Sequence, residues 1–163
     1  MKVLLLRHGQ RKGEGDELTL TGHQQARDLV LNFMNPQHWL YTLRPTRLFC
    51  SPKNRCRQTL TPLSQALSVP ITISELVDER KPPESMAKFS ERVILFISQV
   101  ERSLGENDAL LICTHFDWLE EFIALAPTDL LAPEEIQHFA PGEIHGFEIT
   151  RGVWCYQGPR AWA

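Results

Sequence analysis

The chain has 163 residues, of which 42% are hydrophobic and 23% are charged, values that are typical of one soluble globular domain. Its net charge of −3 gives no general attraction to nucleic acid or to an anionic membrane surface. The longest apolar run near the start, residues 3–6, is too short for a membrane span or a signal sequence. We therefore predict a cytoplasmic protein that has neither nucleic acid nor membrane among its partners.

The first predicted elements are a strand, a loop and a helix. Residues 2–7 form an apolar run that ends just before His8, as in a buried parallel strand. A polar loop over residues 10–16 precedes a helix, for which Thr21 is the expected N-cap and Gln24 completes a capping box. The expected apolar face of this helix consists of Ala26, Leu29, Val30 and Phe33.

The middle of the chain continues the alternation of strands and helices. Residues 47–50 predict a second strand, and residues 70–74 predict a third. Between them, Ser51 is the expected N-cap and Pro52 the first residue of a helix that runs to about Leu67.

After Pro82 and Pro83 we expect a long helix with an apolar face made of Met86, Phe89, Val93, Phe96, Ile97 and Val100. The remaining predicted elements are a strand over 108–113, a helix over 118–125, a short helical turn over 133–139, and a terminal hairpin over 145–150 and 153–156. Because strands alternate with helices, we predict a single α/β domain over 1–163, a three-layer α/β/α sandwich with a mostly parallel mixed sheet.

The cysteines and several isolated residues give weaker signals. Cys50, Cys56, Cys113 and Cys155 form no C-x-x-C pair and have no histidines at zinc-finger spacing, so we predict no metal site and no cofactor. Cys50 and Cys113 each end an apolar stretch and are expected to be buried, reduced thiols. Trp118 is a candidate for the mouth of a pocket. Four histidines are expected at the surface: His23, His38, His138 and His145.

Residues suited to phosphate chemistry follow the predicted strands. They are Arg7, His8 and Gly9 after the first strand, Arg55 after the second, Glu75, Asp78 and Glu79 after the third, and His115 after the fourth. In open α/β sheets ligands bind beyond the carboxyl ends of the strands, so we expect these side chains at one edge. Guanidinium groups bind phosphate oxygens bidentately, a neutral imidazole can attack phosphorus, and a carboxylic acid can protonate the leaving oxygen.

A cysteine phosphatase is the nearest chemical alternative, and the spacing excludes it. Such an enzyme needs Cys and Arg six positions apart around a loop of free N–H groups. Six positions after Cys50 stands Cys56, and six after Cys113 stands Leu119. In addition, Pro52 removes one N–H group from the loop after Cys50.

The sequence resembles the histidine phosphatase superfamily, which includes the phosphoglycerate mutases and the small phosphohistidine phosphatases. The matching segments keep the family's order and are residues 6–9, 18–26, 51–59, 77–80, 84–93 and 113–115. The resemblance implies a phosphoglycerate mutase-like fold, a nucleophilic His8, and a phosphate pocket made by Arg7, Arg55 and His115. It also implies that Glu79 is the proton donor, although Glu75 and Asp78 remain alternatives. Gln58 and Thr59 are expected to hold their helix in place.

The expected activity is a metal-independent phosphatase that acts on a phosphorylated small molecule or a phosphoprotein through a phosphohistidine at His8. Two alternatives remain, a phosphoglycerate mutase-like transferase and a non-catalytic phosphate-binding module. The sequence departs from the family at two places. Gln10 and Arg11 follow the R-H-G motif, whereas the mutases have Ser or Thr and Asn shortly after it. Only residues 81–83 stand where family members often carry a long insertion before the long helix. Phe116 stands where the family usually has Gly and is expected to narrow the pocket. The oligomeric state cannot be read from the sequence.

Overall fold

The computed structural model describes residues 1–129 and 139–158. Its strands are β1 (Lys2–Arg7), β2 (Arg47–Cys50), β3 (Ile71–Ile73), β4 (Ala109–Thr114), β5 (Ile144–Thr150) and β6 (Val153–Tyr156). They form one sheet in the order β3-β2-β4-β1-β5-β6. The pairs β1–β4, β2–β4 and β2–β3 are parallel, whereas β1–β5 and β5–β6 are antiparallel. This is the mostly parallel mixed sheet that the sequence predicted.

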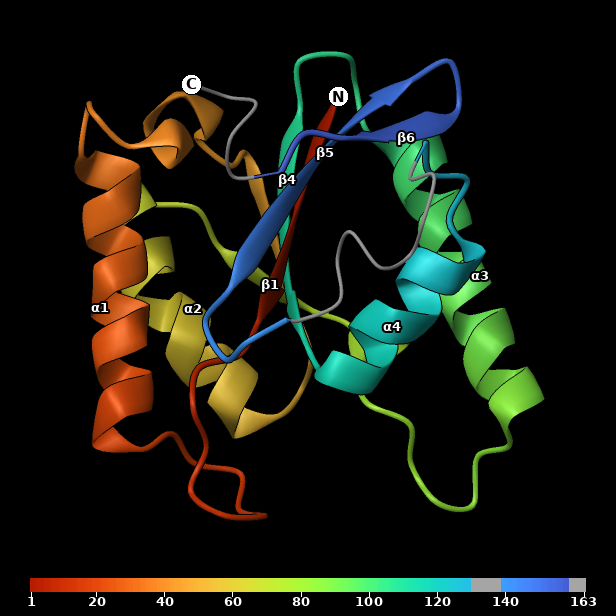
Figure 1. The fold of residues 1–163 in the computed structure, drawn as a ribbon, viewed down its shortest axis with the longest axis horizontal. Helices are drawn as coiled ribbons and strands as arrows, with labels where there is room; N and C mark the ends of the chain where they lie inside the picture. Colours follow the sequence, from red (N-terminus) through yellow and green to blue (C-terminus); the bar gives the residue numbers. More distant parts are fainter. Residues whose placement is uncertain (130–138, 159–163) are drawn as a thin grey trace.

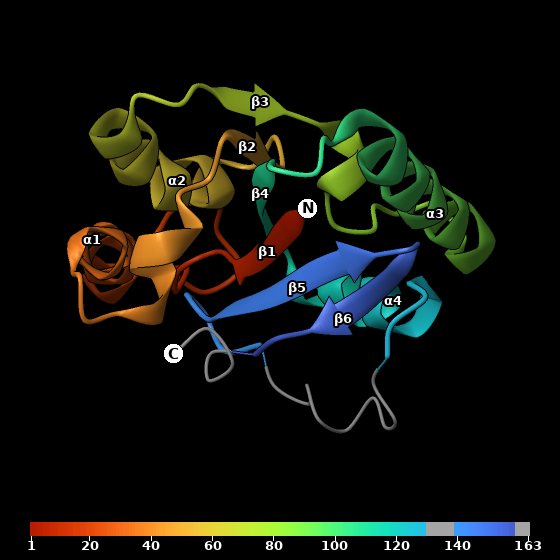
Figure 2. The same cartoon turned by 90° about the horizontal axis from the view of Figure 1, so that it is seen from above.

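Helices cover both faces of the sheet (Figures 1 and 2). On one face lie α1 (Leu20–Met34) and α2 (Asn54–Leu67), and on the other lie α3 (Met86–Ser103) and α4 (Phe116–Leu125). The three-layer arrangement is therefore confirmed. Two short 3₁₀ helices, η1 (Trp39–Leu43) and η2 (Glu75–Val77), were not predicted. In the described part of the chain, no helix has the length and apolar character needed to cross a membrane.

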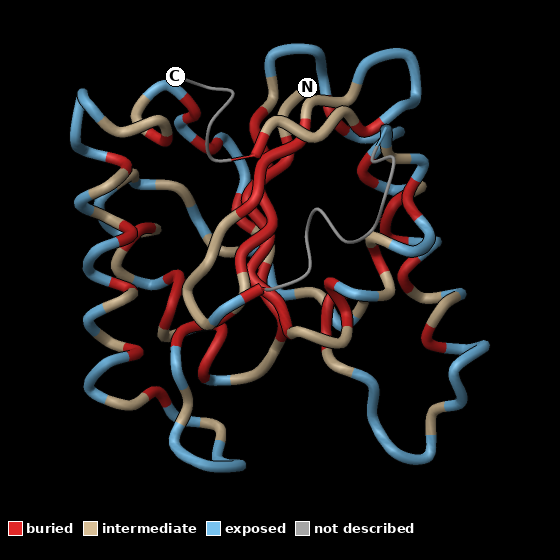
Figure 3. The backbone as a smooth tube through the Cα atoms, in the orientation of Figure 1, coloured by how far each residue is buried: buried red, intermediate tan, exposed pale blue. Residues whose placement is uncertain are grey.

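The two central strands are buried on both faces, as the red tube in Figure 3 shows. In β1, Val3 and Leu5 pack in the hydrophobic cluster under α3 and α4, whereas Leu4 and Leu6 pack in the cluster under α1 and α2. Successive side chains of a strand point to opposite faces, so a strand covered on both sides must be apolar at every position. Burial of each such leucine contributes about 1.5–3 kcal/mol.

The apolar face predicted for α3 is buried except at its first residue. Phe89, Val93, Phe96, Ile97 and Val100 all belong to the core, whereas Met86 is 51% exposed. Met86 opens the helix directly after the N-cap Ser85, so it lies beyond the edge of the sheet that the helix covers.

The structure corrects both predicted helix starts. The N-cap of α1 is Thr19, whose Oγ1 accepts a hydrogen bond from the Gly22 N–H at 3.0 Å, so the capping box of Thr21 and Gln24 is wrong. Thr19 is itself held by the Gln10 carbonyl, which accepts from its N–H at 2.9 Å. The loop before α1 therefore decides where this helix begins.

The second helix begins at Asn54 with Lys53 as N-cap, not at Pro52 with Ser51 as N-cap. The hydroxyl of Ser51 donates to the buried carboxylate of Asp78 at 2.8 Å, a contact between residues far apart in the sequence. The same hydroxyl oxygen accepts from the Lys53 N–H at 3.3 Å, so Ser51 combines this long-range contact with a local hydrogen bond just before the helix.

The other predicted elements differ from the structure by two residues or fewer at their starts. The strand predicted from 108 begins at Ala109, and the helix predicted from 118 begins at Phe116. The terminal hairpin is confirmed as β5 and β6, with β5 beginning at Ile144. Except for Phe139, the helical turn predicted over 133–139 lies outside the described residues.

Cys56 of α2 lies against Cys50 of β2 and Cys113 of β4, and all three are free, buried thiols, which confirms the burial expected for Cys50 and Cys113. Cys56 contacts both of the others. Burial raises the pKa of the Cys113 thiol, and the contact with Cys56 together with burial raises the pKa of the Cys50 thiol. Both thiols are therefore protonated and unreactive in the folded state.

Candidate active site

The predicted site residues gather at the carboxyl ends of the parallel strands, at the lower edge of the sheet in Figure 1. His8 directly follows β1, His115 lies between β4 and α4, and Arg55 is the second residue of α2. The N–H of His8 donates to the Thr114 carbonyl at 3.1 Å, which ties the ends of β1 and β4 together. The centroids of the His8 and His115 rings are 5.3 Å apart.

His8 is held as a neutral imidazole with one unprotonated ring nitrogen. Its Nδ1 lies 2.7 Å from the Gly9 carbonyl oxygen, which can only accept, so Nδ1 carries the proton. Nε2 is then unprotonated and accepts a hydrogen bond from Nε of Arg55 at 3.3 Å. Burial, which leaves His8 only 4% exposed, lowers its pKa to about 3. The lone pair of Nε2 is therefore available at neutral pH.

Arg55 is the centre of the site and is itself buried. Besides His8, its Nη2 contacts Nδ1 of His115 at 3.0 Å and donates to Oε2 of Glu79 at 2.6 Å. Its Nη1 donates to Oδ1 of Asp16 at 2.9 Å. Asp16 is not predicted from the sequence, because a single carboxylate in a polar loop has no spacing pattern that identifies its partner.

Arg7 has an unused donor. Its Nη1 donates to the Phe139 carbonyl at 2.6 Å, and its guanidinium lies 5.1 Å from the centre of the Phe116 ring. Its Nε is buried and has no hydrogen-bond partner among the described residues. A buried N–H without a partner costs free energy, so this group is available to an anion. Phe116, which we expected to narrow the pocket, lies against this guanidinium.

The three candidate acids differ in their surroundings. Glu75 is 70% exposed and Asp78 is completely buried, and Nζ of Lys81 lies 2.7 Å from a carboxylate oxygen of each. Glu79 is 32% exposed and lies between Arg55 and Lys53, whose Nζ is 3.4 Å from Oε1. Partial burial raises the pKa of Glu79, but the hydrogen bond from Arg55 outweighs it, and the pKa is lower than usual. Of these three carboxylates, Glu79 therefore combines contact with Arg55 and access to solvent.

Gly9 has a packing role that the sequence did not reveal. Its N–H donates to Oγ1 of Thr59 at 2.9 Å, and Thr59 in turn donates to the Arg55 carbonyl at 2.7 Å. A Cβ atom at Gly9 would lie 2.9 Å from the carbonyl oxygen of Gly22, too close for any side chain. Glycine is thus needed here for the approach of α1, while Thr59 ties the end of β1 to α2 as expected.

Two residues lie away from their expected places. Trp118 is fully buried, donates from Nε1 to the Leu76 carbonyl at 2.8 Å and stacks on Phe122, so it does not line a pocket mouth. His145 is only 5% exposed, and the prediction that it lies at the surface is wrong. It contacts Oη of Tyr156 at 2.8 Å and Oε1 of Glu143 at 2.9 Å. Glu143 directly precedes β5, and Tyr156 lies on β6 opposite Phe147, so the contact with Tyr156 follows from the pairing of the two hairpin strands.

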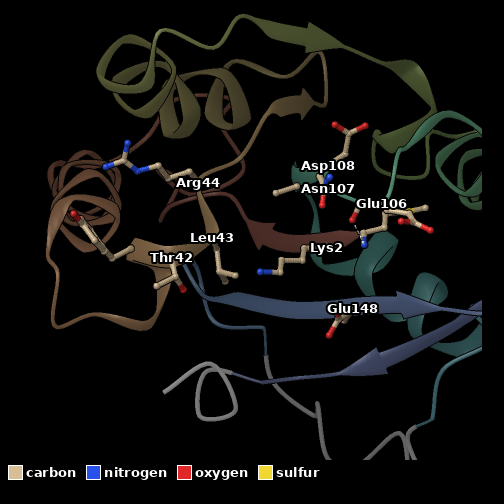
Figure 4. A pocket seen from close by; sticks show the side chains of 11 residues that line it. Lys2, Thr42, Leu43, Arg44, Glu106, Asn107, Asp108 and Glu148 are labelled. Carbon is tan, nitrogen blue, oxygen red and sulfur yellow. Dashed lines mark hydrogen bonds between the residues drawn. The ribbon is translucent and has the colours of Figure 1, made fainter.

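A cavity lies at the opposite edge of the sheet (Figure 4). It has a volume of about 570 Å³ and is lined by charged groups of both signs, among them Lys2, Arg44, Asp108 and Glu148. None of the predicted site residues lines it. Within residues 1–129 and 139–158, no three His, Cys, Asp or Glu side chains are arranged to hold a metal ion.

Comparisons with known proteins agree with the geometry. Residues 3–83, about half of the chain, match the histidine phosphatase superfamily (branch 1). The fold is similar to the α-ribazole phosphatase of Shigella flexneri, with 18% identity, a TM-score of 0.74, and coverage of 100% of this chain and 98% of that chain. The protein histidine phosphatase SixA, solved with tungstate, gives 19% identity, a TM-score of 0.68, and coverage of 98% and 97%.

A phosphoserine phosphatase from Entamoeba histolytica is 15% identical, with a TM-score of 0.71 and coverage of 96% of this chain and 95% of that chain. No curated protein matched the sequence. At these identities the structural likeness shows the fold, which is phosphoglycerate mutase-like. The family match covers the segment that carries His8, Arg55 and Glu79. Taken with the fold, it means that this chain belongs to the histidine phosphatase superfamily, branch 1.

Proposed function

We propose that this chain is a metal-independent phosphatase that hydrolyses phosphate monoesters or phosphohistidine through a covalent phosphohistidine at His8. The observation that carries the proposal is the tautomer of His8. The Gly9 carbonyl holds the proton on Nδ1, and the unprotonated Nε2 faces Arg55. A neutral imidazole nitrogen beside a guanidinium is what attack on a bound phosphoryl group requires.

The proposed reaction has two steps. In the first, the lone pair of Nε2 of His8 forms a bond to phosphorus, the bond from phosphorus to the leaving oxygen breaks, and that oxygen takes a proton from Glu79. In the second, water attacks phosphorus, gives a proton to Glu79, and the P–N bond breaks, returning its electron pair to Nε2. Arg7 and Arg55 balance the charge on the phosphoryl oxygens throughout.

Substrate binding would also prepare the acid. In the ligand-free site, Nη2 of Arg55 holds the Glu79 carboxylate at 2.6 Å and lowers its pKa. Phosphoryl oxygens compete for the same N–H groups and add negative charge nearby. Both effects raise the pKa of Glu79, so a bound phosphate favours the protonated form that can give up a proton.

The proposed function is compatible with more than one class of phosphorylated substrate. The similar structures are an α-ribazole phosphatase, a protein histidine phosphatase and a phosphoserine phosphatase, so the shared fold is compatible with different phosphorylated groups. We expect a phosphorylated small molecule or a phosphoprotein as substrate, and a screen of both classes is the measurement that would identify it.

The covalent intermediate is the direct test. After incubation with a ³²P-labelled phosphate monoester and quenching at alkaline pH, we expect label on His8, and acid should remove it. His8→Ala should lose both label and turnover, whereas the matched variant His23→Ala should keep both. Residual activity above about a thousandth of wild type in His8→Ala would contradict the nucleophile assignment. Binding of phosphate without any turnover would instead favour the non-catalytic module.

A further inference from the structure

A buried chain of polar side chains leads away from the site on the far side of His115. Nε2 of His115 lies 2.7 Å from Oγ of Ser51, and Ser51 donates to Oδ1 of Asp78 at 2.8 Å. Oδ1 of Asp78 is also 3.3 Å from Nε2 of His115. All three residues are at most 2% exposed. A carboxylate is rarely buried so completely unless its charge is used, because desolvation costs several kcal/mol.

The neighbouring donors determine where the proton of His115 lies. Nη2 of Arg55 can only donate, so Nδ1 of His115, 3.0 Å away, is the acceptor in the ligand-free site. Nε2 therefore carries the hydrogen and donates it to Ser51, whose own hydrogen goes to Asp78. The hydrogen bonds run in one direction, from His115 through Ser51 to Asp78.

Further groups face His115 and decide how readily it gains a second proton. Oε2 of Glu79 lies 3.9 Å from Nδ1, and the negative charges of Glu79 and Asp78 favour the imidazolium. Arg55 opposes it. The remaining neighbours are the Cys56 thiol, 3.6 Å from Nε2, and the His8 ring. Burial raises the pKa of Cys56 and lowers that of His8, so both are neutral.

Binding of phosphate would change the partner of Nδ1. Phosphoryl oxygens take over the N–H groups of Arg55, and Nδ1 of His115 then faces an oxygen that can only accept. Two acceptors repel each other unless Nδ1 gains a proton. A buried carboxylate on the opposite side of the ring stabilises that proton, as in other histidines oriented by an acidic partner.

We propose that Asp78, acting through Ser51, is a positioning residue that keeps Nε2 of His115 protonated and allows Nδ1 to take up a proton when phosphate binds. The inference rests on the phosphate-binding site of the proposed function. Asp78 is fully buried and has no route to a leaving group. Burial raises its pKa, but hydrogen bonds from His115, Lys81 and Ser51 outweigh this effect and keep the carboxylate ionised.

The test is a ¹⁵N NMR titration of the histidine rings with and without inorganic phosphate. In the wild type, we expect His115 to be protonated on Nε2 alone without phosphate and on both nitrogens with saturating phosphate at pH 7. In Asp78→Asn, the ratio of doubly to singly protonated His115 at pH 7 with saturating phosphate should fall at least about tenfold. Asp28→Asn, the same change at an exposed carboxylate of α1, should titrate like the wild type.

Ser51→Ala carries the test if Asp78→Asn does not fold, because it removes only the hydroxyl that links His115 to Asp78. It should lower the ratio of doubly to singly protonated His115 with phosphate, because Nε2 loses the hydroxyl that links it to the Asp78 carboxylate. An unchanged His115 titration in the folded variants overturns the proposal, and so does a wild-type His115 that stays neutral with phosphate bound.

The kinetic measurement separates this inference from the proposed function. In Asp78→Asn, the alkaline limb of the kcat/KM profile should move to lower pH and kcat/KM should fall about 10- to 100-fold. Absence of turnover in the wild type would remove the proposed function, while the phosphate-dependent NMR titration would still support the positioning role. Turnover with an unshifted profile in Asp78→Asn would overturn the positioning role alone.

Discussion

At the scale of single residues, the proposed acid is held by the cation that is proposed to bind the substrate. Glu79 and His115 share Nη2 of Arg55 in the structure. A carboxylate held in this way is ionised, and it can act as an acid only after the phosphoryl group has displaced it. The role of Glu79 therefore depends on the leaving group and on occupancy of the site.

Glu79→Gln should discriminate between leaving groups. We expect hydrolysis of phenyl phosphate to slow by about 100-fold, because phenolate needs a proton as it departs. Hydrolysis of p-nitrophenyl phosphate should slow by less than about tenfold, since its phenolate leaves without help. Steady-state kcat/KM for the two esters measures the difference. Equal losses on both esters, or a larger loss in Glu75→Gln, would place the acid elsewhere.

The residues that follow strand ends could be predicted from the sequence, but their partners could not. His8, Arg55 and His115 were expected at one edge because the carboxyl ends of parallel strands converge, and the structure brings them into contact. Asp16 and the link from Ser51 to Asp78 depend on how two loops fold against α2. No local spacing rule connects residues separated by that much chain.

At the scale of elements, the helix starts illustrate the same limit. Thr21 and Ser51 are both residue types that favour the N-cap position, yet α1 begins after Thr19 and α2 after Lys53. Thr19 is hydrogen-bonded to Gln10 and Ser51 to Asp78, contacts that no local spacing pattern predicts. The strands were easier to predict than the helix starts, because burial on both faces leaves an apolar run that is visible in the sequence.

The contact between the first loop and α1 can be tested at Gly22. A Cβ atom there would lie 2.2 Å from the Gln10 carbonyl oxygen, which is impossible without movement of the backbone. Gly22→Ala should therefore lower the free energy of unfolding by about 1–3 kcal/mol, although alanine favours helix. Urea denaturation measures this change in the free energy of unfolding. Gly105→Ala is the control, because its nearest contact would be an ordinary 3.6 Å. Wild-type stability in Gly22→Ala would show that this packing is looser than described.

At the scale of the whole molecule, the sheet divides the interior into two apolar clusters, one on each face. The candidate site lies at the carboxyl ends of the parallel strands, where both clusters end. The alternation of strands and helices was enough to predict this division. The sequence did not predict that two histidines, His8 and His145, would be buried at the rim. Burial lowers the pKa of both, that of His8 to about 3.

Stability should therefore fall as the solution becomes acidic. The unfolded chain binds a proton at each histidine near pH 6.5, whereas the folded chain excludes it at His8 until about pH 3. The stabilising contribution of neutral His8 is complete above pH 6.5 and is lost progressively below it, by roughly 2 kcal/mol at pH 5. Chemical denaturation at pH 7.5 and pH 5 should show this loss, and His8→Asn should reduce it. Equal losses in both proteins would contradict the burial of a neutral His8.

The rate at which a thiol reagent modifies the buried cysteines measures how often α2 separates from the sheet. Cys50, Cys56 and Cys113 are fully buried between α2 and the sheet, whereas Cys155 on β6 is partly exposed. A thiol reagent should modify Cys155 in the folded state and the other three only when α2 separates from the sheet, at rates at least about 100-fold slower. Peptide mapping by mass spectrometry follows each thiol separately. Because Cys56 is next to Arg55 in α2, inorganic phosphate should slow modification of the covered thiols further, which provides a binding assay that needs no turnover.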